Sequence, residues 1–182
     1  MEYIRVPSRL VMKMDGQHHP WHFDGVATAV NQLFKIINPH RAYFGQKDIQ
    51  QIAILQAMNT WIEFTIDLVQ VPIVRDEDGL ALSSRLVLLK DAERAIVIEV
   101  TKKIAQHASV SSANAQDMQA LIKELKSDIQ SIQTHENTLE IDSIECVDPA
   151  TLDPIKVVGN ATIIFVAYLI NGIRLTETRS FT

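Results

Sequence analysis

The stretch DGLALSSR, residues 78–85, places small polar groups and a fixed cation directly after an apolar run. That run reads TIDLVQVPIV over residues 65–74 and predicts a buried strand. A hydrophobic core does not need the hydroxyls of Ser83 and Ser84 or the charge of Arg85. A polyphosphate does bind such groups, because hydroxyls donate hydrogen bonds and a guanidinium presents a planar fork of N–H groups. We interpret the stretch as a phosphate-binding segment, with a polar interdomain loop as the alternative.

A second polar cluster, YFGQKDIQQ, follows the short apolar segment RAYF. Gly45 ends that segment, and Lys47 and Asp48 come next, at the expected start of a helix. Doubly wound α/β proteins bind phosphates and riboses at this place, the carboxyl ends of parallel strands. Lys47 can bind phosphate oxygens as a point charge, and Asp48 can accept hydrogen bonds from ribose hydroxyls. The alternative is a solvated Lys47 and an Asp48 that only caps the helix. Two such clusters after consecutive strands favour the binding interpretation.

Three histidines stand close together in HHPWHF, at positions 18, 19 and 22. Pro20 opposes the i, i+4 pairing of histidines that zinc enzymes use on a helix, and no Glu or Cys is nearby. We therefore predict no metal site here. A substrate-facing histidine and a local turn or packing role both stay open.

The two polar clusters need a scaffold that brings strand ends together. Hydrophobic periodicity predicts four elements in this order: a helix at 24–37 capped by Asp24, a strand at 41–44, a helix at about 49–60 and a strand at 65–74. This alternation is typical of a parallel α/β unit. We expect residues 1–82 to form part of a Rossmann-like domain with a parallel sheet.

The sequence after residue 82 predicts a different arrangement of helices and strands. Helical patterns begin at Asp91 and again near Met118, and the strand-like stretches IDSIECV, ATIIFVAYLI and IRLTETR follow. The Asn171-Gly172 pair between the last two is typical of a two-residue hairpin turn. We expect residues 83–182 to form a smaller α+β domain with an antiparallel sheet.

Composition narrows the class of protein. The chain has 182 residues, of which 47% are hydrophobic and 21% charged, as in ordinary soluble globular proteins. Its net charge of −5 argues against a nucleic-acid partner, and no run of roughly 18 uncharged apolar residues predicts a membrane helix. The N-terminus lacks a signal-peptide core. The single cysteine, Cys146, allows no internal disulfide, so we expect a cytoplasmic protein in which Cys146 packs in a core.

Four stretches together resemble one family closely: HPWHFDGVATAV, INPHRAYFGQKDIQQ, VPIVRDEDGLALSSR and VDPATLDP. They are similar to the pantoate–β-alanine ligases, members of the HIGH/KMSKS nucleotidyltransferase superfamily. The resemblance implies an enzyme that activates pantoate with ATP and Mg²⁺, forming pantoyl adenylate and pyrophosphate. The amine of β-alanine then attacks the adenylate, giving AMP and pantothenate, a coenzyme A precursor.

The resemblance assigns roles to particular residues. ATP would be bound by Gly45, Lys47, Asp48, Val74, Leu82, Ser83, Ser84 and Arg85. Within this set, Lys47, Ser83 and Arg85 would hold the phosphates and act as the catalytic residues, while Val74 and Leu82 would border the adenine. Gln51 and His22 would contact pantoate. The opening stretch would then be a phosphate clamp on the hinge of a closing lid.

The chain departs from the family pattern in two ways. His19, Gln46, Leu82 and Leu86 stand where the family usually has Arg, Glu, Met and Asn. The family also begins with a β-strand half that carries an HxGH phosphate motif, and nothing in this sequence matches it. The chain therefore resembles the C-terminal two-thirds of such an enzyme, and we expect it to be weak or inactive on its own. Strands 41–44 and 65–74 would lack the rest of their sheet, and uncovered parallel strands favour self-association, so we expect a homodimer or a larger assembly. The alternative function is a non-catalytic, nucleotide- or partner-binding remnant.

Overall fold

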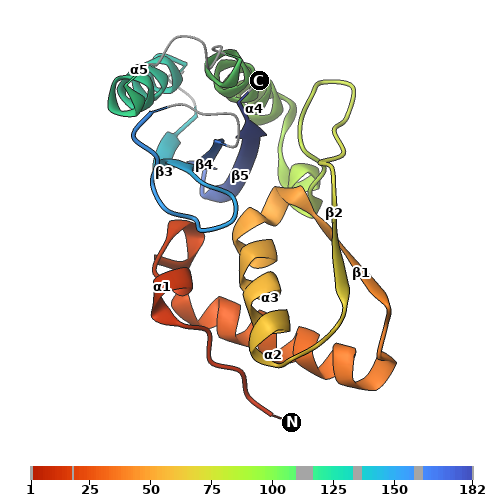
Figure 1. The fold of residues 1–182 in the computed structure, drawn as a ribbon. Coiled ribbons are helices and arrows are strands. Elements are labelled where there is room, and N and C mark those ends of the chain that lie inside the picture. Colours follow the sequence, from red (N-terminus) through yellow and green to blue (C-terminus); the bar gives the residue numbers. More distant parts are fainter. Residues whose placement is uncertain (1, 18, 110–116, 133–136, 158–161, 182) are drawn as a thin grey trace. The chain divides into compact units, whose positions relative to one another are not determined.

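A computed structural model describes residues 2–17, 19–109, 117–132, 137–157 and 162–181 (Figure 1). The chain forms two compact units. The first consists of Met1–Pro72 with Pro149–Leu152, and the second of Ile73–Asp148 with Asp153–Thr182.

The first unit is a small parallel α/β layer. Its elements are α1 (Ser8–Val11), the 3₁₀ turn η1 (Met14–Gln17), α2 (Pro20–Ile37), β1 (Arg41–Gly45), the 3₁₀ turn η2 (Gln46–Asp48), α3 (Ile49–Trp61) and β2 (Asp67–Val71). Strands β1 and β2 pair in parallel, with Gly45 opposite Val71, so the predicted parallel sheet is confirmed. Strand β2 ends before the predicted residue 74 because Pro72, which has no N–H group, follows Val71.

Helices α2 and α3 supply most of the core of this unit. Their apolar positions recur at helical spacing and form one buried cluster that includes Phe23, Ala27, Phe34, Ile54, Leu55 and Met58. Ala42 and Phe44 of β1 pack against this cluster, whereas Tyr43 between them is exposed. The alternation along β1 thus sets one face of the sheet against the helices.

The start of α2 differs from the prediction. The helix begins at Pro20, whose fixed φ suits the first helical position, and not after a cap at Asp24. Asp24 instead lies at an interior position of α2, and its side chain is buried. It accepts hydrogen bonds from the N–H of Val6 at 2.8 Å and the hydroxyl of Tyr3 at 2.9 Å. Its carboxylate ties the amino-terminal segment to α2, so the predicted capping role is wrong.

The second unit is an antiparallel sheet covered by helices. Its elements are the 3₁₀ turn η3 (Ser84–Leu88), α4 (Asp91–Ala108), α5 (Met118–Gln130), β3 (Leu139–Val147), β4 (Ile163–Ile170) and β5 (Ile173–Ser180). The strands pair in the order β3-β4-β5, separately from β1 and β2, as the sequence predicts. Asn171 and Gly172 have φ values of 47° and 82°, which confirms a tight hairpin of the kind that Asn-Gly favours.

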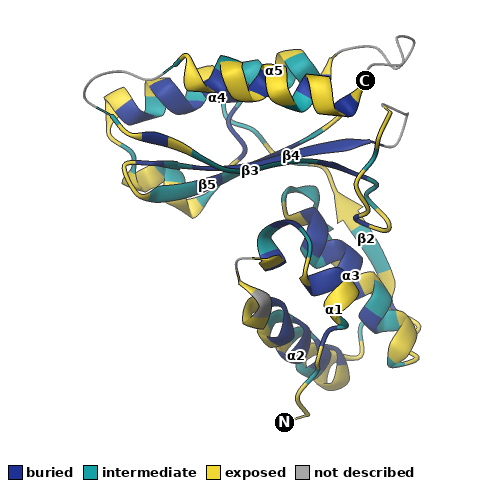
Figure 2. Cartoon of the chain, turned by 90° about the vertical axis from the view of Figure 1, so that its left-hand side faces the viewer, coloured by how far each residue is buried: buried dark blue, intermediate teal, exposed yellow. Residues whose placement is uncertain are grey.

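The core of this unit lies between the sheet and the two helices. Figure 2 shows α4 and α5 along one face of the sheet, with the buried side of each helix turned toward it. Ile164, Val166, Tyr168 and Ile170 alternate along β4 and share one cluster with the helical stripe Ile96, Val100, Ile104, Leu121, Leu125 and Ile129. Cys146 is buried in the same cluster, and burial raises the pKa of its thiol to about 12, so the predicted packing role is confirmed.

The domain boundary expected between residues 82 and 83 stays a prediction. The two compact units divide earlier in the chain, between Pro72 and Ile73. Residues 74–82 already belong to the second unit, because Arg75 forms an ion pair with Glu177 of β5. The end of the parallel sheet and the phosphate-binding segment therefore lie in different compact units.

Candidate functional site

The first polar cluster lies at the carboxyl end of the parallel sheet. The register of β1 and β2 places Gly45 beside Val71, so both strands end at the same edge. Lys47 and Asp48 follow within η2, directly before α3. The N–H groups at the start of a helix carry partial positive charge and favour anions. Gly45, Lys47 and Asp48 thus stand where the sequence places them, and their contact with ATP stays a prediction.

The side chains of η2 differ in exposure and contacts. Asp48 is exposed and, although it precedes α3, its carboxylate makes no capping hydrogen bond to that helix. Asp48 thus occupies the N-cap position that the alternative predicts, but without a capping hydrogen bond from its side chain, and its contact with ribose stays a prediction. Lys47 is half-buried, and Gln46 reaches across to β2, where its amide lies 3.4 Å from the side-chain oxygen of Gln70.

Two adjacent glutamines on α3 have opposite environments. Gln50 is buried, and its amide nitrogen donates to the carbonyls of Leu10 at 2.8 Å and Lys13 at 2.7 Å. Its oxygen accepts a hydrogen bond from the N–H of Gly16 at 3.1 Å. Gln50 thereby holds the turn that contains η1 against the start of α3. Sequence reasoning missed this role, and the only signal was a glycine in the turn.

That turn has no room for a side chain at Gly16. A Cβ atom at this position would lie 1.8 Å from the carbonyl oxygen of Val11, well inside van der Waals contact. Close backbone approach is a usual reason for glycine. The tight turn lets the amide of Gln50 reach three backbone groups at once.

Gln51, the predicted pantoate contact, is half-buried one position further along α3. Consecutive helix residues point about 100° apart, since a turn has about 3.6 residues. Gln51 makes no side-chain hydrogen bond within the part of the chain that the structure describes. Its amide is therefore uncommitted, whereas that of Gln50 is used by the fold.

The histidines of the HHPWHF motif lie at the start of α2. His22 is exposed, and its ring meets that of Phe23 edge-on, with centroids 5.2 Å apart. His19 directly precedes the helix and is exposed, and His18 lies outside the described residues. Among the residues placed by the structure, no group of three or more His, Cys, Asp or Glu could hold a metal ion.

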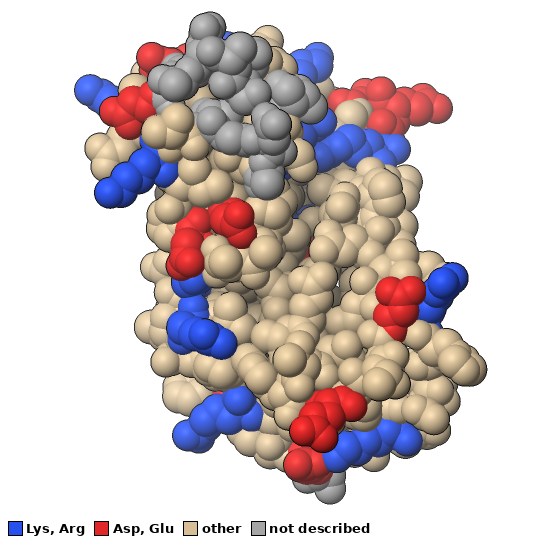
Figure 3. All heavy atoms as spheres, in the orientation of Figure 1, with Lys and Arg blue, Asp and Glu red and all other residues tan. Residues whose placement is uncertain are grey.

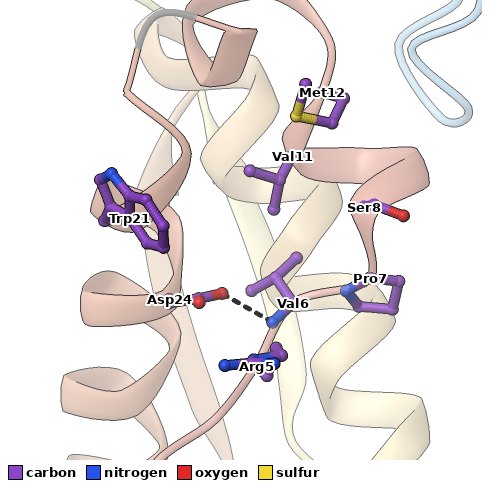
Figure 4. Close-up of a pocket in the computed structure, with 8 residues that line it drawn as sticks. All are labelled: Arg5, Val6, Pro7, Ser8, Val11, Met12, Trp21 and Asp24. Atoms are coloured by element: carbon purple, nitrogen blue, oxygen red, sulfur yellow. Dashed lines mark hydrogen bonds between the residues drawn. The ribbon is translucent and has the colours of Figure 1, made fainter.

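A cavity of about 490 Å³ lies beside the same end of α2 (Figure 4). It is lined by Arg5, Val6, Pro7, Ser8, Val11, Met12, Trp21 and Asp24. Trp21 is 80% exposed at its rim, and Asp24 is held there by the N–H of Val6. None of the residues predicted to bind ATP or pantoate belongs to this lining, so the cavity is distinct from the predicted contacts.

The second polar cluster starts η3 in the other unit. The hydroxyl oxygen of Ser83 accepts a hydrogen bond from the N–H of Arg85 at 3.2 Å and so caps η3. Ser84 is exposed at the first position of that turn. The guanidinium of Arg85 donates to the carbonyl of Arg174 at 2.8 Å, and no carboxylate among the described residues forms an ion pair with it. Arg85 therefore keeps its charge uncompensated.

Val74 and Leu82, the predicted adenine contacts, are neighbours. The N–H of Leu82 donates to the carbonyl of Val74 at 3.0 Å, and both side chains are exposed. Exposed apolar side chains next to a guanidinium suit a flat ring that carries phosphates. The structure thus brings Val74 and Leu82 together with residues 83–85. Lys47 lies in the other compact unit.

On the face drawn in Figure 3, the described Lys and Arg side chains are interspersed with Asp and Glu and form no continuous basic surface. No helix within the described ranges is long and apolar enough to cross a membrane.

A model of the family described as Pantoate-beta-alanine ligase matches residues 2–179. The chain belongs to this family. The resemblance identified from the four sequence stretches is therefore confirmed.

Curated relatives agree with this assignment. The pantothenate synthetase of Thermosipho africanus is 39% identical over 162 residues, which are 89% of this chain and 56% of the relative. That of Ruminiclostridium cellulolyticum is 34% identical over 174 residues, 96% of this chain and 60% of the relative. The chain thus spans less than two-thirds of the length of these pantothenate synthetases.

Solved structures of the family share the fold. Pantothenate synthetase from Thermus thermophilus superposes with a TM-score of 0.89 at 29% identity and covers 100% of this chain and 64% of that one. Pantoate-beta-alanine ligase from Francisella tularensis, complexed with beta-gamma ATP and beta-alanine, gives a TM-score of 0.71. It is 21% identical, with 99% of this chain and 58% of that one covered, and supports the fold alone. The expected fold class is confirmed.

Proposed function

We propose that this protein takes part in the ATP-dependent condensation of pantoate with β-alanine, through pantoyl adenylate, to give pantothenate, AMP and pyrophosphate. The observation that carries the proposal is the family match over residues 2–179. The turn after β1, with Lys47 and Asp48 at the carboxyl edge of a parallel sheet, supports it.

In the first step, a carboxylate oxygen of pantoate attacks the α-phosphorus of ATP, and the bond to the pyrophosphate oxygen breaks. Negative charge grows on the departing pyrophosphate, so fixed donors and cations lower the barrier. We assign this role to Lys47, Ser83 and Arg85. In the second step, the amine of β-alanine attacks the acyl carbon and AMP leaves. Neither step needs a nucleophilic side chain, and none is assigned.

The remaining nucleotide contacts follow from side-chain chemistry. Asp48 is exposed beside Lys47 and can accept hydrogen bonds from ribose hydroxyls. Val74 and Leu82 offer adjacent apolar side chains to the adenine ring. Gly45 and Ser84 would contribute mainly through backbone approach at the ends of β1 and at the start of η3.

Pantoate offers a carboxylate and hydroxyls, and it must lie beside the α-phosphate. Gln51, with its uncommitted amide two positions into α3, can hydrogen-bond a pantoate hydroxyl close to the helix terminus that Lys47 precedes. His22 is the second proposed pantoate contact, and its ring is exposed on α2.

Mg²⁺ is proposed to enter with the nucleotide. This cation usually keeps several waters and binds phosphate oxygens with few protein ligands. The described residues fit such a mode, because no larger metal-binding cluster lies among them. The bound cation would neutralise charge on the triphosphate.

We also propose that the protein is a cytoplasmic homodimer. The exposed apolar side chains of Leu33, Ile36 and Ile37 on α2 support self-association, since burying them would remove apolar surface from water. The single, buried Cys146 suits a reducing compartment. Light scattering on the purified protein tests the dimer, and a monodisperse monomer would contradict it.

A second candidate, nucleotide binding without ligation, is favoured by the residues after the phosphate-binding segment. The family usually has Asn where this chain has Leu86, and Val87 and Leu88 next to it are exposed. At residue 86 an apolar side chain thus stands where the family usually has a polar one, directly after the phosphate-binding segment.

Pantoate-dependent exchange between ATP and pyrophosphate separates the two candidates. We would fuse the part of the Thermosipho africanus relative that has no counterpart here to the amino terminus of this chain. The ligase proposal predicts exchange that requires pantoate, disappears in Lys47→Ala and persists in Lys123→Ala, a substitution of an exposed lysine on α5. The 182-residue chain on its own should exchange weakly. A fusion that binds ATP without any pantoate-dependent exchange would favour the second candidate.

A further inference from the structure

Residues 74–82 form a short hairpin that leads directly into Ser83. The N–H of Leu82 donates to the carbonyl of Val74 at 3.0 Å and closes the hairpin. At its turn, Gly79 has a φ of 83°, a backbone conformation that favours glycine. The position of this hairpin therefore decides where the following hydroxyls and guanidinium are presented.

A buried carboxylate on β5 anchors the hairpin. Glu177, whose side chain is 3% exposed, lies 2.7 Å from Nη1 of Arg75 and 2.8 Å from Nε of Arg179. A carboxylate removed from water is stable only when it is paired and hydrogen-bonded. The two guanidiniums meet both requirements and are fixed in return.

The same guanidiniums hold the turn of the hairpin. Arg75 donates from Nη1 to the carbonyl of Gly79 at 2.9 Å and from Nη2 to the carbonyl of Thr178 at 3.2 Å. Arg179 donates from Nη2 to the same Gly79 carbonyl at 3.4 Å. Two arginines that Glu177 orients thus converge on one carbonyl of the turn.

Helix α4 fixes the internal shape of the turn by separate contacts. Nη2 of Arg94 lies 2.6 Å from Asp76 and 2.7 Å from Asp78, and Asp76 also accepts the N–H of Leu80 at 2.9 Å. Burial raises the pKa of Asp76, but hydrogen bonds from Arg94 and the backbone outweigh this and hold the pKa below its usual range. The contacts that Glu177 makes through Arg75 and Arg179, by contrast, attach the turn to strand β5.

We propose that Glu177 is a positioning residue for Ser83, Ser84 and Arg85, the polar end of the phosphate-binding segment. It acts through Arg75 and Arg179 on the hairpin that leads into these residues. At the other end of the segment, Arg85 donates to the carbonyl of Arg174 on the same strand, so β5 holds the segment from both sides. The inference rests on the proposed function, because the position of Ser83, Ser84 and Arg85 is expected to change the affinity for ATP.

The experiment compares three variants with the unsubstituted protein. Glu177→Gln keeps an acceptor oxygen but removes the charge between two arginines. Arg75→Lys keeps a cation for Glu177 but carries all its donors on one nitrogen, so it does not reproduce the separate contacts of Nη1 and Nη2 with two carbonyls. It replaces the first variant if that one fails to fold. Ile104→Val is the matched control, since Ile104 is buried in the same core and lies further along α4 than Arg94, the residue that contacts the turn of the hairpin. Calorimetric titration gives the Kd for ATP, and hydrogen exchange reports amide protection over residues 80–88.

We expect roughly tenfold weaker ATP binding and faster exchange over residues 80–88 in Glu177→Gln and Arg75→Lys. Ile104→Val should lower thermal stability and leave both quantities unchanged. The proposal is overturned if amide exchange over residues 80–88 is unchanged in Glu177→Gln and Arg75→Lys. It is also overturned if Ile104→Val speeds this exchange as much as they do, because the effect would then be a general loss of stability. If the unsubstituted protein binds no ATP, the proposed function fails, and hydrogen exchange alone then decides whether Glu177 positions the segment.

Discussion

Replacing Gln50 by leucine should destabilise the first unit, whereas the same substitution at its neighbour Gln51, the predicted pantoate contact, should not. Gln50 is 4% exposed, and its amide serves two carbonyls, those of Leu10 and Lys13, and the N–H of Gly16. Leucine has a similar size but no polar atoms. The substitution therefore leaves three backbone groups without the partner that Gln50 supplies.

The expected cost follows from these lost contacts. A buried polar group without a partner costs about 1–3 kcal/mol. The Lys13 carbonyl is only partly buried and can reach water, so we count mainly the Leu10 carbonyl and the Gly16 N–H. The free energy of unfolding should fall by about 3 kcal/mol, which corresponds to a drop in the thermal midpoint of roughly 6–12 °C.

Tryptophan fluorescence reports the unit in question, because Trp21 and Trp61 are the two tryptophans of the chain and both lie in the first unit. The matched control is Gln51→Leu, the same substitution one position along α3 at a half-buried amide without a structural hydrogen bond in the described chain. It should leave the midpoint nearly unchanged and weaken pantoate binding. Equal midpoints for Gln50→Leu and Gln51→Leu would refute the assignment of Gln50 as the residue that holds the turn.

Two further predictions concern the second unit. Hydrogen bonds from the N–H of Lys90 and the side chain of Asn171 lower the pKa of Glu93, and the pKa of Asp76 is also lowered. Such carboxylates contribute stability above their unfolded pKa values of about 4, and this stability is lost as the pH falls through the lower folded values. The free energy of unfolding, measured with urea, should therefore fall as the pH is lowered below about 4. The fall should be less steep in Glu93→Gln, and an identical dependence on pH in the two proteins would contradict this. Cys146, with a pKa raised to about 12, should resist thiol reagents at pH 8 until the protein unfolds, and rapid labelling of the folded protein would disprove its burial.

The sequence predicts the elements well where one periodicity runs over many residues. The stripe on α5 and the alternation on β4 each define a face without any knowledge of the partner. The Asn171-Gly172 turn is likewise a local property, because its left-handed backbone angles favour these two residues. Element ends are less determined, as Pro20 and Pro72 show.

The contacts that fix the candidate site could not be predicted in the same way. Glu177 lies in IRLTETR, where alternation of polar and apolar residues does not distinguish a buried acid from a solvated one. Its burial depends on Arg75, about a hundred positions earlier in the chain. Asp24 and Gln50 are similar cases, since their partners lie in the amino-terminal segment. Periodicity predicts which face a residue occupies, but it does not predict which distant group pairs with it.

ATP binding by the protein and by two variants tests the central claim most directly. The proposal is that Lys47, in the turn after β1, and Arg85, in η3, both contact phosphates of ATP. Calorimetric titration should show saturable, Mg²⁺-dependent ATP binding that Lys47→Ala and Arg85→Ala each weaken at least roughly tenfold, with smaller effects at high salt because charge attraction is then screened. Lys123→Ala should bind like the unsubstituted protein. Undiminished ATP binding in either Lys47→Ala or Arg85→Ala would contradict the claim.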